Sequence, residues 1–229
     1  RSRYAFASVT IHTNYLVNLA AVDPLVRERS IAAFHDELER AARLGAEYLV
    51  VHPGSCRGGT VGEGIRNAIE AIREAADGLA LDGVTVLIEN TAGQGDCIGR
   101  SYEQVAEIVE GAERDVRMGM CLDTAHSFAA GYELLSEAGF RRTIRKLGET
   151  VGVDRVKVVH FNDSKVPFGS NVDRHWHIGE GHIGLEGLGR VARSKALAHA
   201  ALILETPIDA DHSEAWNFAR LEELAHGRS

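Results

Sequence analysis

The stretch VTVLIE, residues 84–89, decides the fold, because it is a short apolar run that ends on a carboxylate. Its branched residues follow one another without strict polar alternation, as in a strand buried on both faces of a parallel sheet. Five further runs have the same form, and each also ends in His, Asp or Glu. They are residues 7–12, 47–52, 117–123, 155–160 and 200–205, which end at His12, His52, Asp123, His160 and Glu205.

Helical patterns lie between these runs. Apolar residues recur at helical spacing over residues 25–44, 65–76, 102–109, 140–151, 185–197 and 215–224. Gly45 is placed to end the first helix, and Ser101 is placed to cap the third, with Gln104 completing the cap. Strand and helix therefore alternate throughout, without a linker-like segment. We predict a single domain over residues 1–229.

This alternation leaves two architectures, a doubly wound open sheet or a barrel. An open sheet gathers its functional groups at one switch point, whereas a barrel gathers them at the carboxyl ends of all its strands. Six ligand-type strand ends favour the barrel. We predict an α/β fold of the (β/α)8 TIM-barrel type. About six units lie in this chain, and the two that closure still needs are expected before Arg1.

Composition limits the class of protein. The chain has 229 residues, 45% of them hydrophobic, and a formal net charge of −8, which argues against a broad basic surface for nucleic acid. Its three cysteines show no CxxC pairing and are odd in number, which favours free thiols in a reducing cytoplasm. No signal peptide is visible, and no apolar run approaches the roughly 20 residues that span a bilayer.

Three further ligand-type residues join the strand ends. His126 follows Asp123 by three residues, and Asp173 and His175 are separated by one, so an extended backbone points both side chains to the same side. Nitrogen and carboxylate ligands together suit zinc, with manganese or iron as alternatives. The nine groups are too many for one ion. Shared among three ions, with one carboxylate bridging, they leave room for water.

Each of these residues also has an ordinary structural interpretation. A lone histidine at a strand end is more often a hydrogen-bonded structural residue than a ligand, and a lone carboxylate there is often a helix cap. The structural interpretation must hold nine times independently, however, so we favour a multi-metal site. The glycines around His177 and His182 indicate tight turns, and we interpret the remaining histidines as surface residues: His35, His199, His212 and His226.

Several long motifs carry a family resemblance. In order they are IHTNYLVNL, VVHPGS, IENTAGQG, CLDTAHSFAAGY, HFNDSK, FGSNVDRHWHIGEGHIG and LILETP. From about Arg3 to the C-terminus the chain resembles the endonuclease IV family, metal-dependent apurinic/apyrimidinic endonucleases of base-excision repair. The resemblance implies a (β/α)8 barrel with three zinc ions. It implies hydrolysis of the phosphodiester 5′ to an abasic site in double-stranded DNA.

The resemblance also assigns residues by position. It gives the first ion His12, His52 and Glu89; the second Glu89 as a bridge with Asp123, His160 and Glu205; and the third His126, Asp173 and His175. Glu89 and Glu205 are the catalytic carboxylates. Tyr15 and Leu16 match residues that wedge into the base stack, although Tyr15 could simply pack on the following helix. Asn162, Lys165 and Arg174 are expected at DNA phosphates, with solvated loop charges as the alternative.

A xylose isomerase-like sugar isomerase or epimerase is the second candidate. Its one- or two-metal site would use Glu89, Asp123, His160 and Glu205. Such an enzyme has no need of His126, Asp173 and His175, which is why we favour the nuclease. Because two strand–helix units of the family have no counterpart here, we expect weak or absent endonuclease activity from residues 1–229 alone.

Overall fold

The computed structural model describes residues 8–227, which form two compact units. The first contains residues 8–89 and 95–121, and the second contains residues 90–94 and 122–227. The prediction of one domain over the whole chain stays a prediction. None of the helices within residues 8–227 is long and apolar enough to cross a membrane.

The first unit alternates strictly between strand and helix. Its elements are β1 (Thr10–His12), α1 (Pro24–Leu44), β2 (Tyr48–Val51), α2 (Val61–Ala76), β3 (Thr85–Glu89), α3 (Tyr102–Ala112) and β4 (Met118–Asp123), whose last two residues belong to the second unit. The strands pair in parallel in chain order, with Ile11 opposite Leu49 and Glu89 opposite Cys121. Their carboxyl ends therefore lie along one edge of the sheet.

The helix ends follow the local sequence. Asp23 caps α1 by accepting hydrogen bonds from the Leu25 and Val26 amides, and Gly45 ends the helix with a φ of 65°. Ser101 caps α3 through the Gln104 amide, as predicted. The Gln104 side chain does not complete that cap, because its oxygen accepts from the amides of Gly99 and Arg100.

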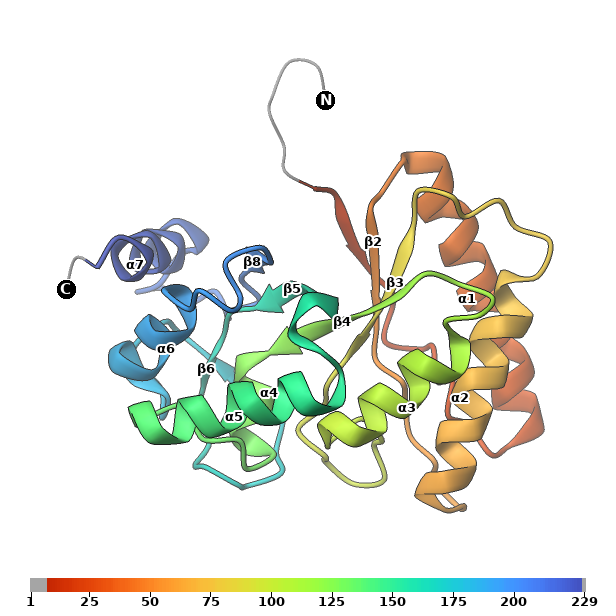
Figure 1. Cartoon of the computed structure of the whole chain (residues 1–229), viewed down its shortest axis with the longest axis horizontal. Helices are drawn as coiled ribbons and strands as arrows, with labels where there is room; N and C mark the ends of the chain where they lie inside the picture. The colour runs from red at the N-terminus through yellow and green to blue at the C-terminus, as the bar shows by residue number, and fades with distance from the viewer. Residues whose placement is uncertain (1–7, 228–229) are drawn as a thin grey trace. The chain divides into compact units, whose positions relative to one another are not determined.

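The core of the first unit lies between its strands and helices. Leu49, Val50 and Val51 of β2 are consecutive and fully buried, as are three consecutive residues of β3. A strand shows this pattern only when both of its faces are covered, which confirms the prediction made from its sequence. Phe34 and Leu38 bring α1 onto the sheet. Figure 1 shows α1 and α2 side by side next to these strands.

The second unit contains the remaining elements. These are α4 (Thr124–Ala129), α5 (Glu137–Thr150), a 3-10 turn (Val153–Arg155), β5 (Val156–His160), β6 (Asp163–Ser164), β7 (His175–Trp176), α6 (Gly184–Ala192), β8 (Ala201–Ile203) and α7 (Glu214–Ala225). Strands β5 and β8 are parallel, with His160 opposite Ile203. The short β6 and β7 form an antiparallel pair between them in sequence. Helices α5 and α6 lie side by side (Figure 1).

All six predicted strands are present as β1 to β5 and β8. The predicted start of the first strand at Ala7 lies outside the described residues. The helix predictions differ most from the structure at α4 and α6. The six-residue α4 is too short to show a helical period, so the sequence did not predict it. Helix α6 ends at Ala192 rather than Leu197, because the chain continues into tight turns in which Leu197 donates to the Ser194 carbonyl.

Candidate metal centre

Three predicted ligands lie together in the first unit, at the carboxyl ends of neighbouring strands. His12 ends β1, His52 directly follows β2, and Glu89 ends β3. Oε2 of Glu89 is 2.9 Å from Nε2 of His12 and 3.5 Å from Nε2 of His52. The Glu89 side chain is fully buried, so its charge requires a positive partner.

These distances suit two ligands of one ion. Zinc bonds of about 2.0–2.2 Å place neighbouring ligand atoms roughly 3.3 Å apart in a tetrahedron. Nδ1 of His12 lies 2.8 Å from the Thr13 carbonyl, which can only accept a hydrogen bond. Nδ1 therefore carries a proton, and Nε2, which lies next to Glu89, is the ring atom that remains to bind a cation. This first cluster, His12, His52 and Glu89, fits a cation such as zinc.

A second cluster lies in the second unit and contains Asp123, His126, Asp173 and His175. Asp123 ends β4. Its Oδ1 accepts a hydrogen bond from the His126 amide at 2.6 Å, so Asp123 caps the N-terminus of α4, the helix that carries His126. His175 comes from β7, and its Nε2 lies 3.4 Å from Oδ2 of Asp123. Oδ1 of Asp173 lies 3.1 Å from Nε2 of His126 and 3.6 Å from Nε2 of His175.

The two histidines of this cluster are oriented by backbone carbonyls. Nδ1 of His126 is 2.9 Å from the Asn90 carbonyl, and Nδ1 of His175 is 3.2 Å from the Glu205 carbonyl. Since a carbonyl only accepts, each Nδ1 donates a hydrogen bond to it. The two Nε2 atoms then face each other 3.3 Å apart. That arrangement is repulsive unless a cation or a proton lies between them, and with Asp173 beside it the donor set suits zinc.

The last two predicted ligands, His160 and Glu205, form a pair in the second unit. His160 ends β5 and is 2% exposed, and Glu205 follows β8 by two residues. Nδ1 of His160 lies 3.0 Å from Oε2 of Glu205. The parallel pairing of β5 with β8 explains this proximity, because it aligns the carboxyl ends of the two strands.

Asn162 differs from its predicted role at a DNA phosphate. Its side chain is fully buried and is occupied on both sides. Nδ2 donates to Oδ2 of Asp123 at 2.7 Å, and Oδ1 accepts the Glu205 amide at 2.8 Å. A side chain without exposed surface has no access to a phosphate. The structure instead makes Asn162 a support for two predicted ligands.

The other predicted DNA contacts lie on the surface. Tyr15 is 93% exposed and Leu16 is 71% exposed, so neither side chain packs on the following helix. Nζ of Lys165 lies 3.8 Å from the centre of the Trp176 ring. Arg174 is exposed, and its guanidinium donates to the Asp173 carbonyl at 2.6 Å. These four residues have the exposure that a DNA contact needs, and that role stays a prediction.

Sequence reasoning missed two features of the second unit. Asn90 fixes the Asp123 backbone, with its side-chain oxygen accepting the Asp123 amide at 2.9 Å, and its own carbonyl orients His126. Its place directly after Glu89 was the available signal. His212, predicted as a surface residue, is only 17% exposed in its side chain, because it lies between the carboxylates of Asp209 and Glu180.

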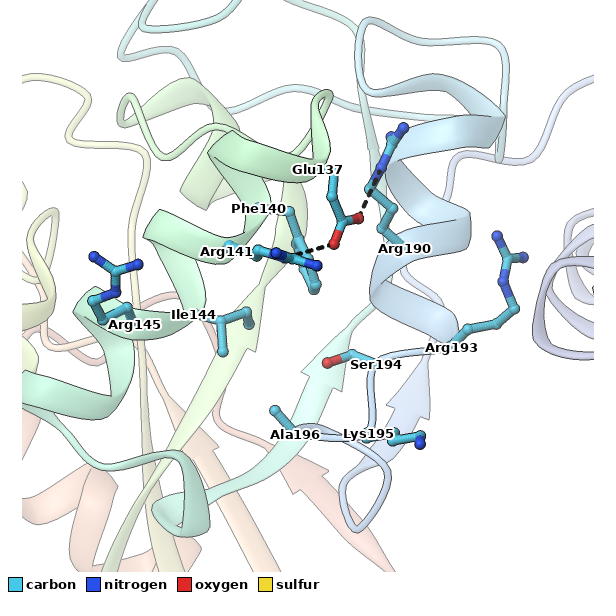
Figure 2. Close-up of a pocket in the computed structure, with 10 residues that line it drawn as sticks. All are labelled: Glu137, Phe140, Arg141, Ile144, Arg145, Arg190, Arg193, Ser194, Lys195 and Ala196. Carbon is cyan, nitrogen blue, oxygen red and sulfur yellow. Dashed lines mark hydrogen bonds and ion pairs between the residues drawn. The ribbon is translucent and has the colours of Figure 1, made fainter.

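A separate cavity of about 620 Å³ lies between α5 and α6. None of the nine predicted ligands lines it. Figure 2 shows Glu137 at its rim, paired with Arg141 at 2.8 Å and with Arg190 at 3.8 Å. Arg145 and Arg193 point away from the space between the helices in that view. The cavity is therefore not the metal centre, and its charges do not converge on one ligand.

Comparisons with known proteins agree with this fold. The family model for the xylose isomerase-like TIM barrel matches residues 3–226. A protein from Solibacter usitatus named "Probable endonuclease 4" is 46% identical over 98% of this chain and 78% of its own length. The crystal structure of endonuclease IV from Thermus thermophilus superposes with a TM-score of 0.80 at 39% identity, covering 95% of this chain and 76% of that one. A D-tagatose 3-epimerase-like protein, with a TM-score of 0.70 at 24% identity over 100% of this chain and 82% of that one, shares the fold.

The alternating parallel strands and the match to the barrel model define the class: this is an α/β protein of the xylose isomerase-like TIM-barrel type, as the sequence predicted. Within that class the chain belongs to the endonuclease IV family. It is a homologue of endonuclease 4 that carries clustered His, Glu and Asp side chains suited to metal ions.

Proposed function

We propose that the protein is a zinc-dependent endonuclease of base-excision repair that hydrolyses the phosphodiester 5′ to an abasic site in double-stranded DNA. Membership of the endonuclease IV family supports this proposal, as does the presence of all nine predicted ligands. An odd number of cysteines without a CxxC pair suits a reducing compartment, and we propose that the protein acts in the cytoplasm.

The arrangement of His126 and His175 is the observation that carries the proposal. Their Nδ1 atoms are engaged by carbonyls and their Nε2 atoms face each other 3.3 Å apart beside Asp173. A sugar isomerase on this kind of barrel has no need of such a set in addition to Glu89, Asp123, His160 and Glu205. The set therefore favours the three-ion nuclease over the isomerase.

Three bound zinc ions would neutralise phosphodiester charge and lower the pKa of water for attack at phosphorus. We assign one ion to the first cluster and two to residues of the second unit. Manganese or iron could replace zinc at some of these positions. Three divalent ions would also add +6 to a chain of formal charge −8, which lowers its repulsion of DNA.

We assign the remaining roles in the reaction to individual side chains. Glu89 and Glu205 are carboxylates placed to accept protons or orient water at the cluster. Tyr15 and Leu16 contact the bases that flank the lesion, where an extruded abasic sugar leaves no pairing to lose. Lys165 and Arg174 contact phosphates, and Asn162 supports Asp123 and Glu205 through its hydrogen bonds.

The test uses a labelled duplex with one abasic site and the zinc-loaded protein. We expect residues 1–229 alone to incise weakly or not at all. We expect the version extended with the rest of the Solibacter relative to make a single incision 5′ to the site, to leave a 3′-hydroxyl that a polymerase can extend, and not to cleave the undamaged duplex. His175→Ala and Glu205→Gln should each reduce the rate by more than about 100-fold, since loss of a ligand exceeds the 10–100-fold cost of losing its support. Metal analysis should give three zinc ions per chain.

Two further measurements separate the alternatives. One or two ions per chain together with interconversion of a ketose, and no incision, would favour the isomerase. Adding the part of the Solibacter relative that this chain does not cover tests whether residues 1–229 need a more complete scaffold. Intact zinc binding without incision by either version would overturn the nuclease proposal.

A further inference from the structure

A glycine-rich segment, residues 179–184 (GEGHIG), follows the ligands Asp173 and His175 and has no role in the proposed chemistry. Its backbone amides converge on one buried carboxylate, Asp163, which is fully buried. Oδ2 of Asp163 accepts from the amides of Gly179 and Gly181 at 3.0 Å, and Oδ1 accepts from Ile183 at 2.9 Å. The amides of Gly184 and Ser164 also donate to this carboxylate.

Glycines allow the backbone amides to approach the Asp163 carboxylate this closely. Gly179 has a φ of +86°, in a region that favours glycine. A Cβ on Gly181 would meet both the Ser164 carbonyl oxygen and the Asp163 carboxylate. Only glycine therefore brings the backbone close enough at position 181. The glycines of the segment thus allow its backbone to wrap around the Asp163 carboxylate.

Backbone pairing joins the Asp163 carboxylate to the metal ligands. In the β6–β7 pair, Asp163 is opposite Trp176 and Ser164 is opposite His175. The Lys165 amide donates to the Arg174 carbonyl at 2.9 Å, between the two ligands, and the His182 amide donates to the Ser164 carbonyl at 2.8 Å. Residues 163–165 thus hold the segment 173–184 at its start through the strand pair and at its end through the carboxylate.

We propose that Asp163 is a positioning residue that holds residues 173–184 so that Asp173 and His175 face His126. This inference rests on the proposed metal-dependent function. Among the described residues, the hydrogen bonds of the Asp163 carboxylate come from backbone amides and not from a predicted ligand side chain, so it acts through the backbone that carries two of the ligands. Burial raises the pKa of Asp163, and the amide donors of Ser164, Gly181, Ile183 and Gly184 oppose that rise.

Asp163→Asn is the direct test. The amide side chain keeps the volume, but its NH₂ group faces backbone donors and leaves part of the segment unbonded. We expect the zinc content to fall from three ions to two, because only the ion of Asp173, His175 and His126 depends on this segment. We also expect amide hydrogen exchange of residues 179–184 to become at least ~10-fold faster. With cobalt(II) bound in place of zinc, the loss of one ion should appear as weaker absorption in the visible spectrum.

Two further variants separate positioning from general destabilisation. Gly181→Ala disturbs the same contacts from the backbone side and should repeat both effects. Ile72→Ala removes a fully buried side chain of α2, so it lowers overall stability without touching this segment. It should retain three zinc ions.

The outcomes are distinct. Three zinc ions bound at unchanged affinity by Asp163→Asn and Gly181→Ala would overturn the inference. It would also be overturned if these two variants lost all three ions and the control Ile72→Ala lost them as well. Wild-type protein that binds no zinc would overturn the proposed function instead. In that case unchanged amide exchange in Asp163→Asn would overturn the inference as well, and faster exchange would support the ordering of the segment by Asp163.

Discussion

The side-chain amide nitrogen of Asn162 lies 2.7 Å from Oδ2 of Asp123, and both side chains are fully buried. The other carboxylate oxygen of Asp123 accepts the His126 amide, so the plane of the carboxylate is fixed from two sides. Through its own oxygen Asn162 also holds the Glu205 backbone. One neutral side chain thus sets the orientation of two predicted metal ligands that lie far apart in the sequence.

Asn162→Ala should therefore weaken both folding and metal binding. A lost hydrogen bond to a buried charge costs about 1.5–3 kcal/mol in unfolding free energy, and loss of a support for a ligand lowers metal affinity by roughly 10–100-fold. Denaturant titration of the apo-protein measures the first effect and zinc competition measures the second. Asn67→Ala is the control, because Asn67 donates to the Ala21 carbonyl and, within residues 8–227, forms no hydrogen bond with a predicted ligand. Equal zinc affinity in the two variants would contradict the prediction.

The strands and the ligand-type residues could be predicted from the sequence for a simple reason. A strand buried on both faces is a continuous apolar run, and in parallel units the residue that ends it lies at the functional edge. Glu89 and His160 could be recognised because local sequence determines both their strand and their place at its end. The caps of α1 and α3 are local in the same way, since Asp23 and Ser101 bond to amides two or three residues away.

Asn162 and Asp163 could not be interpreted correctly because their partners are distant in sequence. Asn162 follows a strand end and carries a polar side chain, which is also the pattern of a phosphate contact. Its burial depends on Asp123, 39 residues earlier, and Glu205, 43 residues later. No local pattern indicates the role of Asp163, because most of the amides that donate to its carboxylate come from a segment 16 to 21 residues further on.

Removal of metal should destabilise the protein, because it leaves the buried carboxylates of Glu89 and Asp123 without cations. A ligand that binds only the folded state raises the free energy of unfolding by about 2.7 kcal/mol when its free concentration is 100 times its Kd. We expect the melting temperature to fall on treatment with a chelator and to recover on adding zinc. Chelator saturated with zinc beforehand is the control. An unchanged melting temperature after complete zinc removal would contradict a metal site built on these residues.

Leu16→Ala and Tyr15→Ala should reduce incision while leaving stability within about 0.5 kcal/mol, since both side chains are exposed. The reduction should appear mainly as weaker binding to the abasic duplex, with zinc content unchanged. Leu44→Ala is a matched control, because Leu44 in α1 is 71% exposed, the same as Leu16. Binding by fluorescence anisotropy and single-turnover incision measure the effect. If Leu16→Ala and Leu44→Ala behave alike, exposure alone does not give Leu16 a role in DNA recognition.

His212 should make stability depend on pH through its position between two carboxylates. Nδ1 lies 3.1 Å from Oδ1 of Asp209, and Nε2 lies 3.2 Å from the Glu180 carboxylate. The rings of His177 and Trp216 cover the imidazole, stacked at 4.1 Å and edge-on at 4.5 Å. Burial lowers the pKa of His212, but the hydrogen bonds and charges of Asp209 and Glu180 outweigh it and raise the pKa above its ordinary value.

The sign of the pH dependence follows from these shifts. A histidine whose pKa is raised on folding stabilises the protein below its unfolded pKa of about 6.5, and this contribution is lost as the pH rises through the folded pKa. Burial raises the pKa of Asp209, but hydrogen bonds from the Asp211 amide, His177 and His212 lower it well below its usual range. Its contribution is present above an unfolded pKa of about 3.9 and is lost as the pH falls further.

The stability difference between wild type and His212→Gln should therefore be largest between about pH 4 and 6.5 and should shrink at alkaline pH, as measured by urea titration across that range. A difference that stays constant from about pH 5 to pH 9 would show that His212 contributes by packing rather than by charge.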